Sequence, residues 1–447
     1  MDLISLVPQF GGLLWTILAF VVALSVIVAI HEYGHYIVGR WTGIEAEVFS
    51  LGFGPTLFAR TDRRGTRWQV AALPLGGYVK FKGDANAASG TDPEQLAHMS
   101  EEEKRHTMAG APLWARALTV AAGPAFNFAL SILIFTGVFM LRGAPMEPLT
   151  VGDMRELPAA GQLQEGDEIL AMAGTPPPSF ENPESFGEFS DDLPREALID
   201  YRVRRDGAER TVEGPYPYPP IVTQVMPRSA AFETGLRPGD VITAVEGERI
   251  VAFEELKEVV EGSNGQALSL TVWRDGEEME MTLAAKRVDE PQPDGGFVTH
   301  WRIGIIGGLA FEPATQMVGP VEAFTSGVVQ TANIVEGSLS GLWHMITGAI
   351  SSCNLSGPVG IAETSGAMAS QGAVTFIWFI AVLSTAVGLL NLFPIPVLDG
   401  GHLVFYAYEA VAGRPPSDQA LQVLMGAGLV LILGLMGFAL TNDIFCP

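Results

Sequence analysis

The chain has 447 residues and a formal net charge of −24, with 48% hydrophobic and only 17% charged residues. So strong a negative charge argues against nucleic acid as a partner, and the apolar composition indicates a protein only partly dissolved in water. About −18 of the charge lies between residues 143 and 312. We therefore expect a soluble acidic region between two membrane-rich ends.

Four apolar runs are long enough to cross a bilayer, which takes about 20 residues. They cover residues 13–38, 112–141, 374–393 and 421–440. The first lacks the basic start and the small-residue cleavage site of a signal peptide, so an uncleaved span is expected. A further run, 319–350, contains Glu322, Glu336 and His344, which predicts an amphipathic helix on the membrane surface.

Basic residues indicate which loops face the cytoplasm. The loop 41–111 is rich in arginine and lysine, the loop 394–420 carries Arg414, and no base precedes the first span. Both loops are therefore expected in the cytoplasm. Both termini and the acidic region would then lie outside, in the periplasm of a bacterial inner membrane.

The first span ends in the sequence HEYGH. On a helix, His31 and His35 project from one face and can bind one metal ion between them. Glu32 can reach a metal-bound water as a general base without being a ligand. Because polar groups at this depth cost several kcal/mol without partners, a functional cluster is favoured over an interfacial His/Glu group.

A tetrahedral catalytic zinc needs a third protein ligand. The preferred candidate is Asp399 in NLFPIPVLDGGH, because it follows the third span on the same side of the membrane as His35. Pro394 and Pro396 would break the helix just before it. The alternative ligands are Glu45, Glu47 and His402.

The spacing of two further residue pairs predicts their roles. Gly123 and Asn127 share one face of the second span, which predicts close packing against the first span and makes Asn127 a candidate for a supporting role. Cys353 and Cys446 are 93 positions apart and show no metal-binding or redox spacing. We expect two ordinary thiols there.

The acidic region contains an internal repeat. QEGDEILAMAG at 164–174 matches RPGDVITAVEG at 237–247, and the triplet RDG recurs in both units. The repeat length suits two small domains with short strands and a hairpin at each Asp-Gly. Both units resemble PDZ domains, although the first departs from the usual helix. Such domains bind extended peptides by strand addition, and a spacer or steric filter is the alternative.

Taken together, these motifs resemble the site-2 proteases, which are intramembrane zinc metalloproteases. Further matching stretches are SLGFGP (50–55), ALPLGGYVKFKGD (72–84), AAGPAFNF (121–128), NLSGPVGIA (354–362) and FPIPVLDGGHLVF (393–405). The resemblance implies a multi-pass α-helical membrane protein of four spans, with two periplasmic PDZ-like α+β domains and a membrane-associated β-hairpin. The expected parts are 1–142 with two spans, PDZ-like domains 143–217 and 218–290, a linker 291–365, and 366–447 with two spans.

The resemblance also implies roles for individual residues. One zinc ion would be held by His31, His35 and Asp399, and Glu32 would be the catalytic base. Asn391 would contact the substrate or polarise the scissile carbonyl. Substrate backbone would pair with the edge of the hairpin, whose residues Gly76, Gly77 and Tyr78 are the candidate contacts.

The implied substrates are single-pass membrane proteins already shortened outside the cell membrane, such as anti-sigma factors in a stress response, and remnant signal peptides. The PDZ pair would exclude uncut substrates or contact their new ends. A second hypothesis is a non-proteolytic scaffold with a structural zinc, closed by His402 as fourth ligand. A metal transporter is disfavoured, because the spans carry no second set of acids or histidines.

Overall fold

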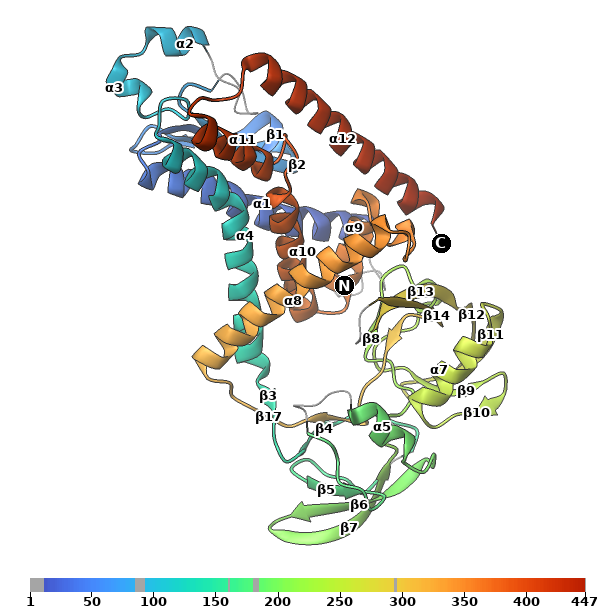
Figure 1. Cartoon of the computed structure of the whole chain (residues 1–447). Coiled ribbons are helices and arrows are strands. Elements are labelled where there is room, and N and C mark those ends of the chain that lie inside the picture. Colours follow the sequence, from blue (N-terminus) through green and yellow to red (C-terminus); the bar gives the residue numbers. More distant parts are fainter. Residues whose placement is uncertain (1–11, 85–92, 160, 180–184, 293–295, 447) are drawn as a thin grey trace. The chain divides into compact units, whose positions relative to one another are not determined.

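The computed structural model describes residues 12–84, 93–159, 161–179, 185–292 and 296–446. Parts of two predicted features, residues 85–92 of the 41–111 loop and 180–184 of the first repeat, lie outside these ranges. The chain forms two compact units (Figure 1). Of the residues described, the membrane unit comprises 12–138 with 323–343 and 352–446, and the β-rich unit comprises 139–322 with 344–351.

Within the described ranges, four helices are long and apolar enough to cross a membrane. They are α1 (Leu13–Trp41), α4 (Leu113–Arg142), α10 (Ala373–Leu392) and α12 (Asp418–Phe445). The four predicted spans are thus confirmed as helices of sufficient length and apolarity. Both α1 and α12 continue beyond the apolar runs, because helical geometry does not end where hydrophobicity ends.

Glycines bring three of these helices together. A Cβ on Gly34 of α1 would lie 2.9 Å from the Phe126 ring of α4, and one on Gly388 of α10 would lie 3.2 Å from Asn127. Buried Ala23 and Ile27 of α1 pack with Ile380 of α10. Small residues let helix backbones approach closely, which is how helices associate where burial from water gives no driving force.

The predicted helix at 319–350 is also present, as α8 (Pro320–Ile346). Its Gly327 packs against Thr136 and the Ile132 carbonyl of α4. The sequence reasoning did not find α9 (Pro358–Ser370), which packs against Thr16 of α1 through Gly366. The remaining helices of the membrane unit are α2 (Pro93–His98), α3 (Glu101–Lys104), the 3-10 turn η2 (Ser352–Asn354) and α11 (Asp399–Ala412).

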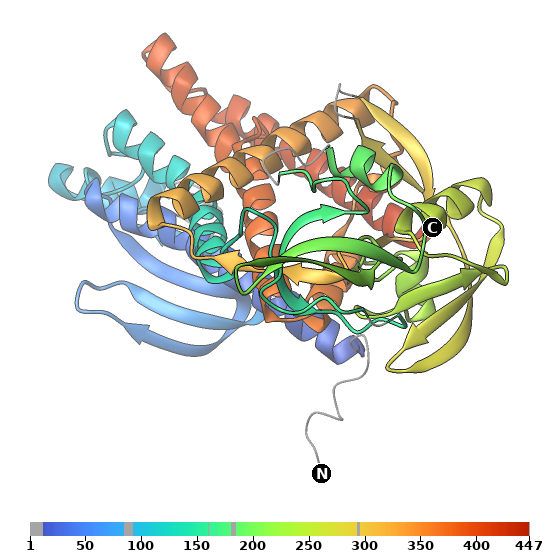
Figure 2. The ribbon, with the colours of Figure 1, turned by 90° about the horizontal axis from the view of Figure 1, so that it is seen from below.

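The loop between α1 and α4 carries two long strands, β1 (Ala46–Thr61) and β2 (Arg67–Phe81). Residues 48–51 of β1 have partners on both sides, with 67–70 on one side and 77–80 on the other. The two parts of β2, before and after the Leu-Pro-Leu-Gly-Gly segment at 73–77, therefore both pair with β1. The hairpin lies along α1 (Figures 1 and 2).

The expectation of two ordinary thiols was wrong. Cys353 and Cys446 form a disulfide, with their Cα atoms 5.6 Å apart. Spacing in sequence could not reveal it, because the partners meet only when the end of α12 reaches η2. The neighbouring Asn442 and Asp443 strengthen this junction, since Asn442 donates to the Ser352 carbonyl and Asp443 accepts the Gly357 amide.

The β-rich unit contains two lobes with separate cores. The first lobe has the sheet β5–β6–β7, formed by Glu168–Met172, Leu198–Arg205 and Ala208–Pro215, with helix α5 (Ser185–Asp191). The second has the sheet β10–β9–β11–β12, formed by Glu248–Arg249, Val241–Val245, Ala267–Arg274 and Glu277–Ala284. Its helices are α6 (Ala230–Thr234) and α7 (Phe253–Gly262).

The segment expected to begin the linker at residue 291 instead completes both lobes. After the hairpin β13 (Lys286–Pro291) and β14 (Phe297–Arg302), three short strands pair with strands from much earlier in the chain. These pairs are β15 (Ile305–Ile306) with β8 (Gln224–Val225), β16 (Phe311–Pro313) with β4 (Val151–Met154), and β17 (Thr315–Gln316) with β3 (Ala144–Pro145). Strands of two or three residues carry too little pattern to be predicted.

A buried ion pair in each lobe explains why both repeat units contain Gly-Asp and Arg-Asp-Gly. Asp167 accepts two hydrogen bonds of 2.6 Å from Arg205 in the first lobe, and Asp240 accepts two of 2.6 Å from Arg274 in the second. Asp240 is only 1% exposed. Each aspartate also accepts the backbone amide three residues before it, which forms the turn. In each lobe, the aspartate of the first motif is therefore paired with the arginine of the second.

We predict that Arg274→Met destabilises the second lobe by about 3–5 kcal/mol, because it leaves the buried Asp240 carboxylate without its cation. Amides of the sheet should then exchange with deuterium at least 100-fold faster in the full-length protein. The control is Arg204→Met. The Arg204 side chain is 43% exposed in its pair with Glu168, so the loss should stay below about 1 kcal/mol. Equal effects of the two variants would contradict this account.

We also predict that the protein, unfolded without reductant, does not react with a maleimide probe. After reduction, two probes should attach per chain. Cys353→Ser should free the Cys446 thiol, so that one probe attaches without reduction. Labelling of the unreduced, unfolded wild type would show that the bridge is not formed.

Candidate metal centre

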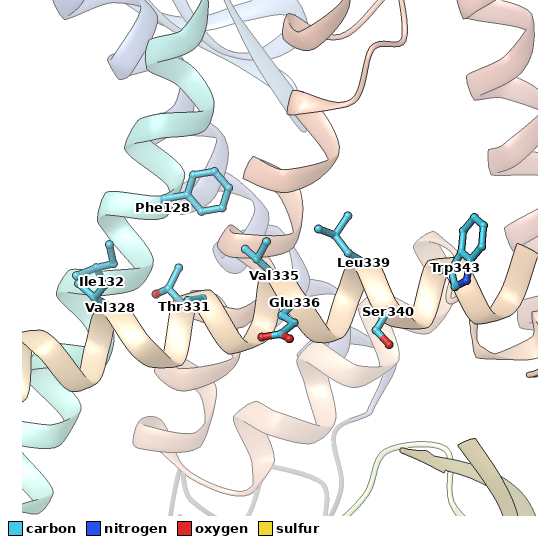
Figure 3. Close-up of a pocket in the computed structure, with 10 residues that line it drawn as sticks. Phe128, Ile132, Val328, Thr331, Val335, Glu336, Leu339, Ser340 and Trp343 are labelled. Atoms are coloured by element: carbon cyan, nitrogen blue, oxygen red, sulfur yellow. The ribbon is translucent and has the colours of Figure 1, made fainter. Parts of the chain in front are cut away.

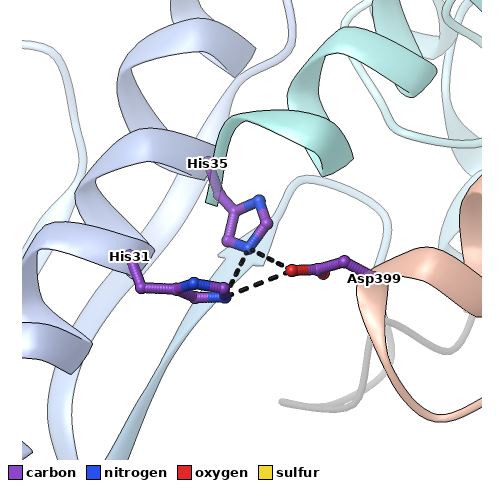
Figure 4. A group of neighbouring side chains, drawn as sticks. All are labelled: His31, His35 and Asp399. Carbon is purple, nitrogen blue, oxygen red and sulfur yellow. Dashed lines mark hydrogen bonds and ion pairs between the residues drawn. The ribbon is translucent and has the colours of Figure 1, made fainter. Parts of the chain in front are cut away.

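Three side chains from distant parts of the membrane unit converge on one point (Figure 4). His31 and His35 come from α1, and Asp399 is the first residue of α11. The two Nε2 atoms are 3.2 Å apart, and Asp399 Oδ2 lies 3.2 Å from that of His31 and 3.4 Å from that of His35. The structure thus brings together the three residues that were predicted as ligands.

These distances suit a zinc ion. Tetrahedral bonds of about 2.0–2.1 Å place neighbouring donor atoms roughly 3.3 Å apart. The Asp399 Oδ2 atom is buried and makes no hydrogen bond of acceptable geometry, although both imidazole nitrogens are near it. A carboxylate oxygen buried in this way needs a cation, so the donor set fits the metal that the motif predicts.

A backbone carbonyl fixes the orientation of His35. Its Nδ1 lies 2.8 Å from the Thr119 carbonyl oxygen of α4, and a carbonyl can only accept. The proton of the neutral ring must therefore be on Nδ1, which leaves the Nε2 lone pair free to bind a metal. The sequence could not reveal this contact, because any residue at position 119 supplies a carbonyl.

Asn127 plays the corresponding role for His31. Its amide nitrogen lies 3.2 Å from His31 Nδ1, while its Oδ1 is buried without a partner. If Nε2 binds the metal, Nδ1 carries the proton, and turning the amide by 180° lets Oδ1 accept it. Asn127 therefore has a defined contact, with His31 Nδ1, through which it can orient the ring.

Gly123 lies between these two contacts on α4. A Cβ there would overlap His35 Nε2 and would come within 2.8 Å of His31 Cε1. The prediction that this face packs against the first span is confirmed. The glycine also leaves the space that the two rings occupy.

Glu32 lies beside the ligands and contacts the hairpin. Its carboxylate lies near the backbone of Val79 in β2, and a Cβ on Gly77 would come within 3.1 Å of Glu32 Cγ. Gly77 is thus placed where the strand passes the candidate base. Gly76 and Tyr78 are turned toward Phe53 instead.

The other predicted residues take different positions. Asn391 is half-buried and donates to the Val387 carbonyl one turn earlier in α10. The alternative ligands Glu45 and Glu47 form ion pairs with Lys82 and Lys80. His402 packs against Phe405 and is not in the convergent group of described residues.

Two glycines explain how Asp399 reaches the histidines. A Cβ on Gly400 would overlap the Phe393 carbonyl, and one on Gly401 would overlap the Ile395 carbonyl. The Leu-Asp-Gly-Gly sequence therefore lets α11 begin directly against the end of α10. The aspartate is carried on the first turn of a helix rather than on a free loop.

A groove of about 770 Å³ runs beside α4, between it and α8 (Figure 3). Its walls include Phe128 and Ile132 of α4, with Val335, Leu339 and Trp343 of α8. Phe128 directly follows Asn127, the residue that contacts His31. The membrane unit therefore has an apolar groove, and one of its walls is formed by α4, the helix that contacts both histidines.

We predict that Gly123→Ala weakens zinc binding at least tenfold, because the added methyl displaces the two ligand rings. The control is Gly137→Ala on the same helix, where an added Cβ meets no atom within 4 Å. Zinc retained after dialysis against a chelator, measured by elemental analysis, should fall only for Gly123→Ala. Equal retention by the two variants would contradict the geometry.

Comparison with known proteins matches residues 19–435 to peptidase family M50. A protein of Agrobacterium fabrum, provisionally named a zinc metalloprotease, is 38% identical over 444 residues, or 98% of each chain. A similarly named protein of Brucella suis is 36% identical over 437 residues, which is 97% of this chain and 96% of that protein. The regulator of sigma-E protease RseP of Escherichia coli is 32% identical over an alignment of 466 positions, which covers 96% of this chain and 98% of that protein. With a donor set that suits zinc and this match over nearly its whole length, the chain belongs to peptidase family M50 and is a zinc metalloprotease.

Proposed function

We propose that this metalloprotease is an endopeptidase that cuts transmembrane segments of single-pass membrane proteins within the bilayer. The observation that carries the proposal is the position of the metal centre. Two ligands lie on α1, a helix apolar enough to span a membrane, and the third begins the helix after α10, another such helix. The peptide bonds that such a site can reach are those of membrane-embedded segments.

The residues of the site have separate roles in hydrolysis. His31, His35 and Asp399 would hold one zinc ion, which when bound lowers the pKa of a coordinated water to about 7 and polarises a carbonyl. Glu32, beside the ligands, is positioned to take the proton from the nucleophile and deliver it to the leaving amine. Asn391 would contact the substrate near the scissile carbonyl.

The hairpin can supply the extended substrate conformation that hydrolysis needs. Residues 77–81 pair with β1 on one edge, and the described residues provide no strand on the other. Val79 of this strand lies near Glu32. An unwound substrate segment that adds to this edge would therefore pass the candidate base. The apolar groove between α4 and α8 would accept the helical part of the same segment.

The disulfide supports a periplasmic position for the C-terminus. Disulfides persist in oxidising compartments such as the periplasm, so the end of α12 and η2 would lie on that side of an inner membrane. The basic loops 41–111 and 394–420 would then face the cytoplasm, with the metal centre near that face.

The two lobes of the β-rich unit would act as periplasmic PDZ-like domains. Each combines a small antiparallel sheet with a short helix, and the two share a repeated buried ion pair. They would exclude substrates that have not been shortened, or contact their new ends. By analogy with the name of the Escherichia coli relative, the substrates would include anti-sigma factors in regulated intramembrane proteolysis, together with remnant signal peptides.

We predict that Glu32→Gln abolishes cleavage of a tagged transmembrane substrate, with a loss of at least 100-fold, while zinc content is unchanged. His35→Ala should lose both cleavage and zinc, because it removes a ligand. The assay uses the full-length protein in bilayers, with and without chelator. Normal cleavage by Glu32→Gln would eliminate Glu32 as the base, and cleavage only of soluble peptides would eliminate the intramembrane role.

A further inference from the structure

We propose that the ion pair between Arg116 of α4 and Glu409 of α11 is a positioning element of the metal centre. It sets where α11, and with it Asp399, lies relative to the two histidines. The inference concerns metal binding alone, so it does not depend on which substrates the enzyme cuts.

The pair is bidentate and largely removed from solvent. Arg116 Nη2 donates to Glu409 Oε1 at 2.6 Å, and Nη1 donates to Oε2 at 3.1 Å. The two side chains are 15% and 18% exposed. The guanidinium carbon also lies 5.2 Å from the centre of the Tyr406 ring, which is on α11 as well. One arginine thus makes two contacts with the helix that carries Asp399.

The helix transmits this restraint to the metal centre. Asp399 and Glu409 are ten residues apart on α11, which is about 15 Å along the axis of a rigid helix. The first turn is held by the close packing of Gly400 and Gly401 on the end of α10. Among the described residues, Glu409 is the position beyond Asp399 where a side-chain hydrogen bond joins α11 to another helix. Without this second attachment, α11 could tilt about its first turn, which would change the direction in which the Asp399 carboxylate points.

All three ligands would then be positioned from one face of α4. Arg116, Thr119, Gly123 and Asn127 are spaced by three, four and four residues, so they form a single stripe on that helix. Thr119 holds His35, Asn127 holds His31, and Gly123 makes room for both rings. The Arg116 contact completes this set, because it holds the helix of the third ligand.

The chemistry of the pair favours arginine over lysine. A planar guanidinium matches a carboxylate with two parallel hydrogen bonds, which fixes orientation as well as distance. Arg116 Nε is already buried without a hydrogen-bond partner. Loss of Glu409 would leave the rest of the guanidinium unsatisfied too, so α11 would be expected to shift.

The test uses Co²⁺ as a spectroscopic probe bound to the full-length protein in detergent. Arg116→Gln and Glu409→Gln should each weaken Co²⁺ binding about 10- to 100-fold, as loss of a group that orients a ligand typically does. Each should also change the visible absorption of the bound ion, which reports ligand geometry. Because both changes remove one interaction, the double variant should bind no more weakly than the worse single variant.

The controls separate positioning from general stability. Lys104→Gln removes an exposed ion pair on α3 and should leave affinity and spectrum unchanged. Glu409→Asp keeps the charge and should retain more affinity than Glu409→Gln, and Arg116→Glu combined with Glu409→Arg should recover part of it. Thermal unfolding of the metal-free proteins identifies any variant that fails to fold, and the conclusion is then drawn from Glu409→Asp. Wild-type affinity and spectrum in the folded variants, or strictly additive losses, would overturn the proposal.

Discussion

The side chains of His31, His35 and Asp399 meet among apolar helices, and the packing of those helices holds them together. Such a cluster is stable only with a cation and with outer hydrogen bonds that fix the rings. The Thr119 carbonyl and the Asn127 amide supply those bonds from α4. The position of α4 beside α1 is therefore the constraint on which the centre depends.

Glycines satisfy this constraint by letting helices approach where side chains would separate them. Gly34 and Gly388 bring α1 and α10 against α4, while Gly123 leaves room for the histidine rings. Gly400 and Gly401 do the same for the helix that carries Asp399. Packing of this kind suits a membrane, because lipid provides no hydrophobic force to press helices together. The small residues determine both the packing of the helices and the shape of the site.

The β-rich unit is stabilised by a different kind of contact. Its lobes bury ordinary apolar cores, and each adds one buried aspartate–arginine pair that ties a turn to a hairpin. The chain returns after residue 291 to add short strands to both lobes. Each lobe is thus closed by residues distant in sequence, so neither can be complete until the whole region has been made.

The sequence by itself determined the four long apolar helices and the internal repeat, and it identified His31, His35 and Asp399 as candidate zinc ligands. These follow from periodicity, apolarity, side-chain chemistry and the resemblance to a known family, all of which can be read along the chain. Only the tertiary structure decided the Cys353–Cys446 disulfide, the short strands after residue 291 and the contacts of Thr119 and Arg116. The reason is physical. Such contacts join backbone groups or side chains far apart in the chain, and their partners are set by how helices and strands pack.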